Sequence, residues 1–231
     1  MDIFTRYHAW RDKPGKGEQG SPPDKGLKRF AFILKTHFFK LIRLNLLFIL
    51  FCIPVITIPA SMAGMTRVLM RLTREGICDM WTDFWKEFKT EFTQRLLAWL
   101  ILTVIPVIVA MLPVLFIVET PTTGLWIALS AVSYAIQCYL FPLWTILDVS
   151  LKANIRNAFA LCLMEWKRSL LILITAGGVH VFCFLFFPVS APLLLLISFS
   201  FAQLIICVIV NEPIEKHLIR EKPVIEKSPV L

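Results

Sequence analysis

The apolar residues of this chain are gathered into three long stretches, and the basic residues lie only between and outside them. All 24 Lys and Arg residues fall into four segments, which cover residues 1–43, 67–95, 152–168 and 216–227. Membrane proteins retain Lys and Arg on the cytoplasmic side, so four basic segments separated by apolar stretches indicate four cytoplasmic segments joined by membrane hairpins. The pattern predicts a topology and says little about chemistry.

The second and third apolar stretches are each long enough for two membrane spans. A helix needs roughly 20 residues to cross the hydrocarbon core. The second stretch fits spans over 96–118 and 125–148, joined by the turn ETPTTG, and the third fits spans over 170–187 and 193–210, joined by PVSAP. Both hairpins therefore return the chain to the side that it left.

The first apolar stretch is short, because only 23 residues separate Arg43 from Arg67. A single span would place the ten basic residues of the N-terminal segment opposite the other fourteen, against the positive-inside bias. A hairpin that turns at Pro54 to Pro59 would have arms over 38–53 and 60–75, each about 24 Å long. We favour this hairpin, short or re-entrant, and a single span is the alternative.

The predicted fold is an all-α membrane protein with six membrane segments as three hairpins and with amphipathic interfacial helices on the cytoplasmic side. Residues 1–27 are dense in Gly, Pro and charge and cannot bury enough apolar surface to offset chain entropy, so we expect a flexible cytoplasmic leader. The membrane domain would cover residues 28–215, and residues 216–231 would form a cytoplasmic tail. No signal peptide is visible, because the first apolar run begins behind a long charged leader.

A stripe of aromatic residues over 79–95 predicts an amphipathic helix. The stripe recurs at i, i+3, i+4, i+7 and i+11 and consists of Trp81, Phe84, Trp85, Phe88 and Phe92. Such a helix suits the headgroup boundary, where Trp rings are favoured. The alternative is a stripe packed on another helix of the protein, and both place the helix at the inner surface.

Similar amphipathic segments precede the other two hairpins, as LKRFAFILKTHFFKLIR and LKANIRNAFALCLMEWKRS. The chain therefore reads as three copies of one unit, an interfacial helix followed by a membrane hairpin. The copies share little identity, so this repeat is a hypothesis from the pattern alone.

Composition excludes most other classes of protein. With 57% hydrophobic residues, 19 Phe and 7 Trp, the chain is too apolar for a soluble domain. The net charge of +8 flanks apolar spans, so the expected partner is a bilayer with anionic headgroups, and no nucleic acid. Six cysteines lie mostly within apolar runs at no metal or redox spacing and are expected to be packing residues. Because the sequence lacks the usual catalytic motifs, we expect no enzyme, no catalytic residue, no cofactor and no metal.

Polar residues inside the spans are the remaining candidates for a site, since polar groups in hydrocarbon are costly. They are Asn45, Gln137, His180 and Gln203, together with Pro54, Thr57 and Pro59 at the first turn. One interpretation is a polar midplane site, which would suit a transporter with an interrupted helix at the first turn. The other is a set of interhelical hydrogen bonds and a tight turn at the outer surface. Asp148 and Glu212, at the inner ends of spans, are expected to pair with Arg156 and Lys216.

The first apolar stretch and the segment after it resemble a known family. The runs KLIRLNLLFILFCIPVITIPASMAG and REGICDMWTDFWKEFKTEF are similar to those of the YesL-like family of small bacterial membrane proteins. The matching residues are Leu44, Asn45, Leu46, Leu47, Pro54, Thr57, Ile58, Asp83, Phe84, Phe88 and Lys89. The chain departs from the family where Pro59 and Ala60 follow Ile58 directly and where Arg67 replaces an apolar or aromatic residue.

This resemblance covers about residues 10–95 and implies no biochemical activity, because none is established for the family. It implies a bacterial inner-membrane location and an accessory role in carbohydrate uptake or its regulation, with transporter subunits or a membrane signalling protein as partners. We therefore predict a non-enzymatic accessory or scaffold. The alternatives are a small transporter or channel and, less favoured, a membrane-embedded enzyme.

Overall fold

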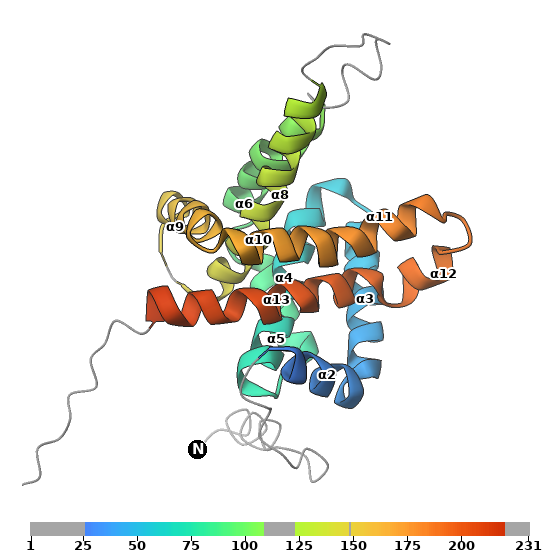
Figure 1. The fold of residues 1–231 in the computed structure, drawn as a ribbon. Coiled ribbons are helices and arrows are strands. Elements are labelled where there is room, and N and C mark those ends of the chain that lie inside the picture. The colour runs from blue at the N-terminus through green and yellow to red at the C-terminus, as the bar shows by residue number, and fades with distance from the viewer. Residues whose placement is uncertain (1–25, 109–122, 148, 220–231) are drawn as a thin grey trace, which may run out of the picture.

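The structure is a computed structural model that describes residues 26–108, 123–147 and 149–219, and in these residues every regular element is a helix (Figure 1). The predicted leader and tail lie mostly outside the described residues, as do the end of the predicted span 96–118 and the turn after it. Asp148, one predicted partner of an ion pair, also lies outside them.

The first apolar stretch forms two helices joined by a turn. α2 (Leu27–Thr36) precedes α3 (Phe38–Cys52), and the short η1 (Val55–Thr57) leads into α4 (Ile58–Glu75). With 15 and 18 residues, α3 and α4 are about 22 and 27 Å long, shorter than a hydrocarbon core of about 30 Å. Gly76 ends α4 in a left-handed conformation, φ 76°, and its N–H donates to Leu72 O.

The predicted helix over 79–95 is in fact two helices, α5 (Met80–Lys89) and α6 (Phe92–Trp99), whose continuation to Ile108 includes the π-helical η2 (Leu100–Val104). The chain bends by 77° at the break, where Glu91 adopts a left-handed φ of 48°. Arg95 donates to the backbone oxygen of Glu87, so a buried guanidinium takes up a carbonyl of the last turn of α5. The prediction of one continuous helix is therefore wrong, and Phe92 belongs to α6.

The remaining helices form the second half of the second hairpin and the whole of the third. α8 (Thr123–Ile146) runs back alongside α6. The third unit consists of α9 (Leu151–Met164), α10 (Trp166–Ile172), η3 (Leu173–Gly177), α11 (Gly178–Leu185), α12 (Ala191–Leu193), η4 (Leu194–Ser198), α13 (Phe199–Ile214) and η5 (Glu215–Ile219). η3, η4 and η5 are π-helical turns within otherwise α-helical rods.

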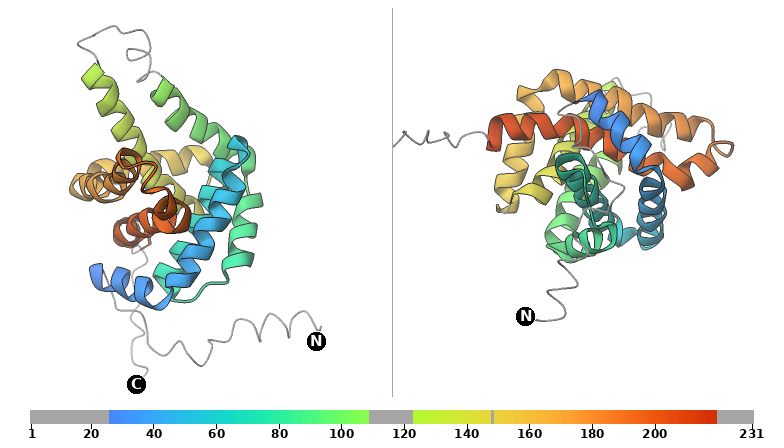
Figure 2. Two further views of the ribbon diagram at one scale, coloured as in Figure 1. Left: turned by 90° about the vertical axis from the view of Figure 1, so that its right-hand side faces the viewer. Right: turned by 90° about the horizontal axis from the view of Figure 1, so that it is seen from below.

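The three hairpins do not run in one direction. α3 and the α6 and α8 pair stand upright in Figure 1, whereas α10, α11 and α13 lie across them; the side view in Figure 2 shows the third hairpin end-on. Amphipathic helices α2, α5 and α9 each precede one hairpin, so the element order repeats three times. The crossing geometry does not repeat, so the hypothesis of three equivalent units holds for the order of elements and fails for their arrangement.

Several helices are long and apolar enough to cross a membrane. Among the described residues these segments are Ala128–Ile146, Trp166–Leu185 and Ala191–Leu218. A fourth results if the bent pair Met80–Lys89 and Phe92–Ile108 is one span. The chain therefore has the helices of a membrane protein, and a total of six membrane segments stays a prediction.

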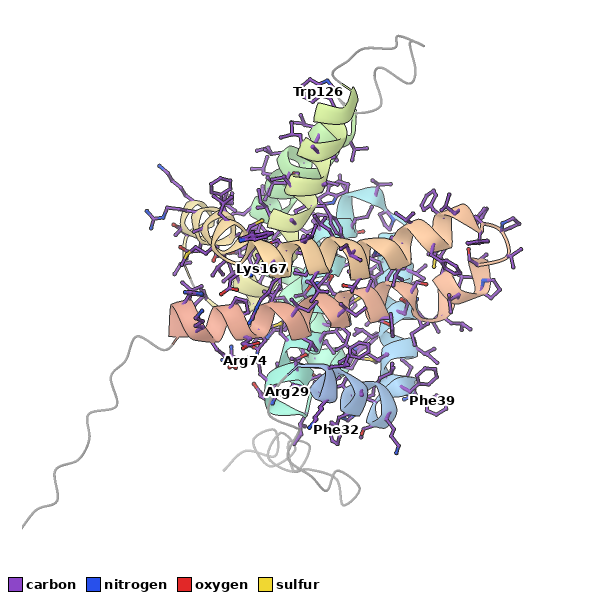
Figure 3. The ribbon with its side chains drawn as sticks, in the orientation of Figure 1. Arg29, Phe32, Phe39, Arg74, Trp126 and Lys167 are labelled. Carbon is purple, nitrogen blue, oxygen red and sulfur yellow. The ribbon has the colours of Figure 1, made fainter. Side chains whose placement is uncertain are left out.

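α4 lies at the centre of the packed structure, where it contacts α3, α5, α6, α8 and α13. Its buried residues belong to both hydrophobic clusters, one built around α8 and α13 and the other around α3 and α4. Charged side chains such as Arg29 and Arg74 lie toward the end of the structure that is opposite to Trp126, at the far end of α8 (Figure 3).

Candidate functional site

Asn45 joins the first hairpin to the third. Its Nδ2 donates to Leu194 O at 3.0 Å and to Leu195 O at 2.7 Å, and its Oδ1 accepts from the N–H of Ser200 at 3.0 Å. These partners lie in and just after the π-helical η4, where widening of the turn leaves backbone groups without their α-helical partners. The fully buried amide of Asn45 satisfies these groups, so it is an interhelical tie.

Gln137 joins the two arms of the second hairpin to each other. Its Nε2 donates to Leu102 O at 3.0 Å, in the π-helical η2, and its Oε1 accepts from Thr103 Oγ1 at 2.7 Å. Ser133, one turn earlier on α8, also donates to Leu102 O. The polar side chains of α8 therefore hold it against the irregular turn that follows α6.

The other predicted polar residues make separate contacts. Gln203 Nε2 donates to Thr66 Oγ1 at 2.8 Å and joins α13 to α4. His180 Nδ1 lies 2.8 Å from Ala176 O in its own helix. Asn45, Gln137 and Gln203 form no hydrogen bond with one another, and each joins a different pair of helices. The structure therefore does not bring them together by direct contact, and the interpretation as interhelical hydrogen bonds describes them.

The first turn is closed by its own side chains. Thr57 Oγ1 is within hydrogen-bond distance of the carbonyls of Phe51 and Pro54, and Ser61 Oγ donates to Phe51 O at 3.1 Å. Pro59 is buried in the first turn of α4, where a missing N–H costs nothing because no partner exists there. The carbonyls that the turn frees are thus largely taken.

The aromatic stripe packs mainly on the first hairpin. Phe84 is fully buried against Gly64, where an added Cβ would lie 2.9 Å from the Phe84 ring. The Phe51 ring centroid lies 5.9, 4.9 and 5.4 Å from those of Phe84, Trp85 and Phe88. Trp81 is 54% exposed. The alternative of a stripe packed on protein therefore describes Phe84, while Trp85, Phe88 and Phe92 are half-buried and Trp81 is exposed.

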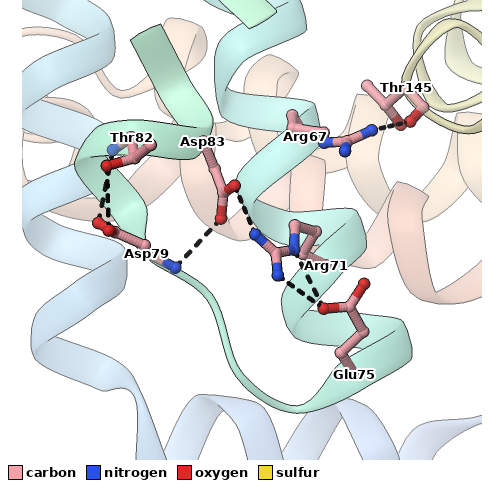
Figure 4. A network of polar contacts seen from close by, with 7 residues as sticks. All are labelled: Arg67, Arg71, Glu75, Asp79, Thr82, Asp83 and Thr145. Atoms are coloured by element: carbon pink, nitrogen blue, oxygen red, sulfur yellow. Dashed lines mark hydrogen bonds and ion pairs between the residues drawn. The ribbon is translucent and has the colours of Figure 1, made fainter. Parts of the chain in front are cut away.

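A cluster of charged side chains fixes α5 to the end of α4 (Figure 4). Arg71 Nη1 donates to Asp83 Oδ1 at 2.6 Å, and Arg71 Nη2 donates to Glu75 Oε2 at 2.9 Å. Asp83 Oδ2 accepts from the N–H of Asp79, and the Asp79 carboxylate caps α5 by accepting from Thr82 N at 3.4 Å. We call these five residues the α4–α5 cluster; sequence analysis had singled out only Asp83, through the family motif.

One turn earlier on α4, Arg67 has quite different surroundings. Its Nη1 donates to Thr145 O, a carbonyl in the last turn of α8 (Figure 4), and it has no carboxylate partner among the described residues. Nearby, Arg95 is 1% exposed and donates to the Glu87 carboxylate as well as to the Glu87 backbone. The sequence marked Arg67 only as a departure from the family pattern, and Arg95 did not stand out as more than a basic residue beside a span.

The two ends of the third hairpin are joined by ion pairs. Glu165 lies 3.0 Å from His217, 3.6 Å from Lys216 and 3.4 Å from Arg168. Arg168 also pairs with Glu212 at 3.1 Å, so the predicted pair of Glu212 with Lys216 is wrong. The hydrogen bond from His217, aided by the positive charges of Arg168 and Lys216, holds the pKa of Glu165 below its usual range.

The described residues contain no group of three or more His, Cys, Asp and Glu side chains that could hold a metal ion. All six cysteines are free, and four of them are buried.

Comparison with known proteins finds one match. Residues 41–112 match the family model described as a protein of unknown function, DUF624. No curated protein and no solved structure matches the chain. The matched segment begins in α3 and includes the whole α4–α5 cluster, Arg67 and Arg95. The part of the chain that is similar to DUF624 therefore contains the charged contacts described above, and the family description assigns them no activity.

Proposed function

We propose that this chain is a YesL-like integral membrane protein that acts as a non-enzymatic accessory or scaffold of a bacterial carbohydrate uptake system or of its regulation. The match of residues 41–112 to DUF624 supports this proposal, because it overlaps the segment with the YesL-like motifs. The apolar helices support a location in the cell membrane. The carbohydrate connection rests on the resemblance alone.

The observation that supports a scaffold role is that polar residues of the apolar helices hydrogen-bond to other helices. Asn45, Gln137 and Gln203 all hydrogen-bond to neighbouring helices, which favours a rigid framework over a passage lined by polar groups. A transporter would need such groups to face a common cavity near the midplane. These residues are therefore not available as the polar midplane site that the alternative, a small transporter, would need.

A polar groove beside the α4–α5 cluster is the surface that we propose for a partner. It has a volume of about 560 Å³ and is lined by Lys40, Arg43, Arg71, Glu75, Ile77 and Asp79, among others. Both signs of charge are present, which suits a polar loop of another protein rather than a lipid tail. By the positive-inside rule this groove faces the cytoplasm, as do both ends of the chain.

The proposal is tested by crosslinking in native membranes. A photoreactive amino acid at Ile77, which is 39% exposed in the groove, should capture a subunit of a transport system or a membrane signalling protein. The matched control carries the same group at Val189, which is 85% exposed at the tip of the third hairpin and should give only lipid adducts. Capture of a second copy of this chain alone at Ile77 would contradict the accessory role and favour the transporter.

Orientation is tested separately at Cys78, in the loop between α4 and α5. A membrane-impermeant maleimide should modify Cys78 in inverted vesicles and not in intact cells, because the loop is proposed to be cytoplasmic. A variant with the other five cysteines replaced makes the readout specific. Modification in intact cells would overturn the topology, and with it the proposed cytoplasmic groove.

A further inference from the structure

A second polar pocket lies where α4, α5, α6 and the C-terminal end of α8 meet. It has a volume of about 350 Å³, and its polar lining includes Arg67, Lys86, Glu87, Arg95 and Trp144. These side chains come from four different helices, so the pocket exists only in the folded protein. We call it the Arg67–Arg95 pocket.

Three N–H donors of this pocket have no acceptor within the described chain. They are Arg67 Nε, Arg95 Nε and Trp144 Nε1, and each of these atoms is buried. Arg95 is 1% exposed and Trp144 is 5% exposed. Buried polar groups are nearly always paired in folded proteins. Three unpaired donors on side chains that line one pocket therefore point to an acceptor from outside the chain.

The charge of the pocket specifies the acceptor further. Arg67, Lys86 and Arg95 are opposed by only two carboxylates, those of Glu87 and Glu91. Glu87 already accepts from Arg95, which leaves Arg67 without a carboxylate among the described residues. A planar guanidinium offers several donors in a geometry that matches oxyanions. A neutral ligand would leave this positive charge unbalanced.

We propose that the Arg67–Arg95 pocket binds an oxyanion of the phosphate type, which is either a free solute or the headgroup of an anionic lipid. A tetrahedral phosphate presents oxygens in several directions and can accept from donors on three helices at once. Ile146, Leu147 and Val149 form an apolar wall that would contact the carbon part of such a ligand. This site does not depend on the scaffold role proposed above, and it adds a ligand that neither the family description nor the sequence motifs indicate.

The test uses the full chain purified in a neutral detergent. Thermal unfolding is followed with added inorganic phosphate, at constant ionic strength with chloride as the replaced anion, and in parallel with micelles that contain phosphatidylglycerol or phosphatidylcholine. A ligand that binds the folded state raises the unfolding midpoint. A rise with inorganic phosphate identifies a free oxyanion, whereas a rise with phosphatidylglycerol only identifies a lipid headgroup.

Trp144→Phe is the most specific variant, because it keeps the aromatic ring and removes a single donor. Phe is smaller than the buried indole, so the unliganded variant should unfold at a lower midpoint than the parent, and binding is read from the shift that the ligand adds to that midpoint. Loss of one hydrogen bond to an anion should weaken binding about tenfold. Trp126→Phe, at the far end of α8 (Figure 3), is the matched control and should bind like the parent.

Arg67→Gln tests the charge, and Arg71→Gln is its matched control on the next turn of α4 (Figure 4). Arg67→Gln should weaken binding about tenfold or more, because a charge-assisted contact is lost. Arg71→Gln should lower stability through Glu75 and Asp83 and leave the dissociation constant unchanged. The proposal is overturned if neither phosphate nor phosphatidylglycerol shifts the midpoint more than its control, or if the pocket variants bind as tightly as Trp126→Phe and Arg71→Gln.

Discussion

In soluble proteins apolar residues are mostly buried and charged residues are mostly exposed. Helix α4 and the arm formed by α10, η3 and α11 show the opposite arrangement. α4 carries Arg67, Arg71 and Arg74, yet most of its residues are buried at the centre of the structure. The arm is far more apolar, but only 22% of its apolar window is buried. Phe184, at its end, is 82% exposed. Polarity therefore does not sort the inside of this protein from its outside.

The physical reason is that the apolar helices indicate lipid, and not water, as the surroundings. Lipid tails are as apolar as leucine, so an apolar helix gains no hydrophobic free energy by moving from lipid to the protein interior. Which helix occupies the centre of the structure therefore depends on close backbone packing and on hydrogen bonds between helices. The first half of α4 offers Ala60, Ser61, Ala63 and Gly64, all buried, and its middle offers Thr66 to Gln203. The arm also has a run of small residues, Thr175, Ala176, Gly177 and Gly178, but of these only Ala176 is buried, and no helix packs closely on either glycine.

The largest effect should come from breaking the buried ion pair beside α4. Glu87→Leu leaves the guanidinium of Arg95 buried without its carboxylate, which should lower the free energy of unfolding by about 3–5 kcal/mol. The measurement is unfolding by denaturing detergent. Glu212→Leu, which breaks the partly exposed pair with Arg168, should cost less than about 1 kcal/mol. Equal losses would mean that the centre and the arm do not differ in this respect.

The next largest difference between α4 and the arm should come from replacing a glycine in each by a larger residue. Gly64→Leu forces the side chain into Phe84 and should lower the free energy of unfolding by about 1–3 kcal/mol. Gly178→Leu is the matched change in the arm, where an added Cβ would lie within 4 Å of no atom beyond its chain neighbours and its own helix backbone. It should be neutral in the same titration. Destabilisation by Gly178→Leu as large as that by Gly64→Leu would show that the arm is covered by something in the folded protein.

Removing a polar tie should have a smaller effect. Asn45→Leu leaves the carbonyls of Leu194 and Leu195 without their side-chain partner, and we expect a loss of about 1–2 kcal/mol. Thr175→Val in the arm removes only a bond to Leu171 O in its own helix and should change stability by less than about 0.5 kcal/mol. An unchanged stability of Asn45→Leu would contradict the role assigned to the π-helical turn.

The smallest effect should be the acid dependence of the ion pairs at the base of the arm. Because the folded pKa of Glu165 is lowered, its stabilising contribution is present above the ordinary Glu pKa of about 4.3 and is lost as pH falls through the folded value. Thermal unfolding of the parent should therefore weaken more steeply on acidification than that of Glu165→Gln. Parallel acid profiles of the two proteins would show that the carboxylate of Glu165 is not held by His217, Lys216 and Arg168.

Expectations that depend on neighbouring residues were met most closely. The predicted arms 38–53 and 60–75 lie within two residues of the bounds of α3 and α4, and the first part of the helix predicted over 79–95 is α5. The continuation of the aromatic period to Phe92 was misleading, because the fold breaks the helix at Glu91 to bury Arg95. The polar candidates Asn45, Gln137 and Gln203 are buried, but the sequence left their partners open.

The sequence by itself determined where most helices and turns lie, because hydrophobic period, proline and charge act over a few neighbouring residues, but it missed the break between α5 and α6. The tertiary structure alone decided which helices lie at the centre, how the third hairpin crosses the others, and which polar groups meet. Asn45 and its partner Leu195 are 150 positions apart, and the donors of the Arg67–Arg95 pocket come from three helices. Such contacts depend on close packing of side chains that are distant in the chain, and no local pattern encodes them.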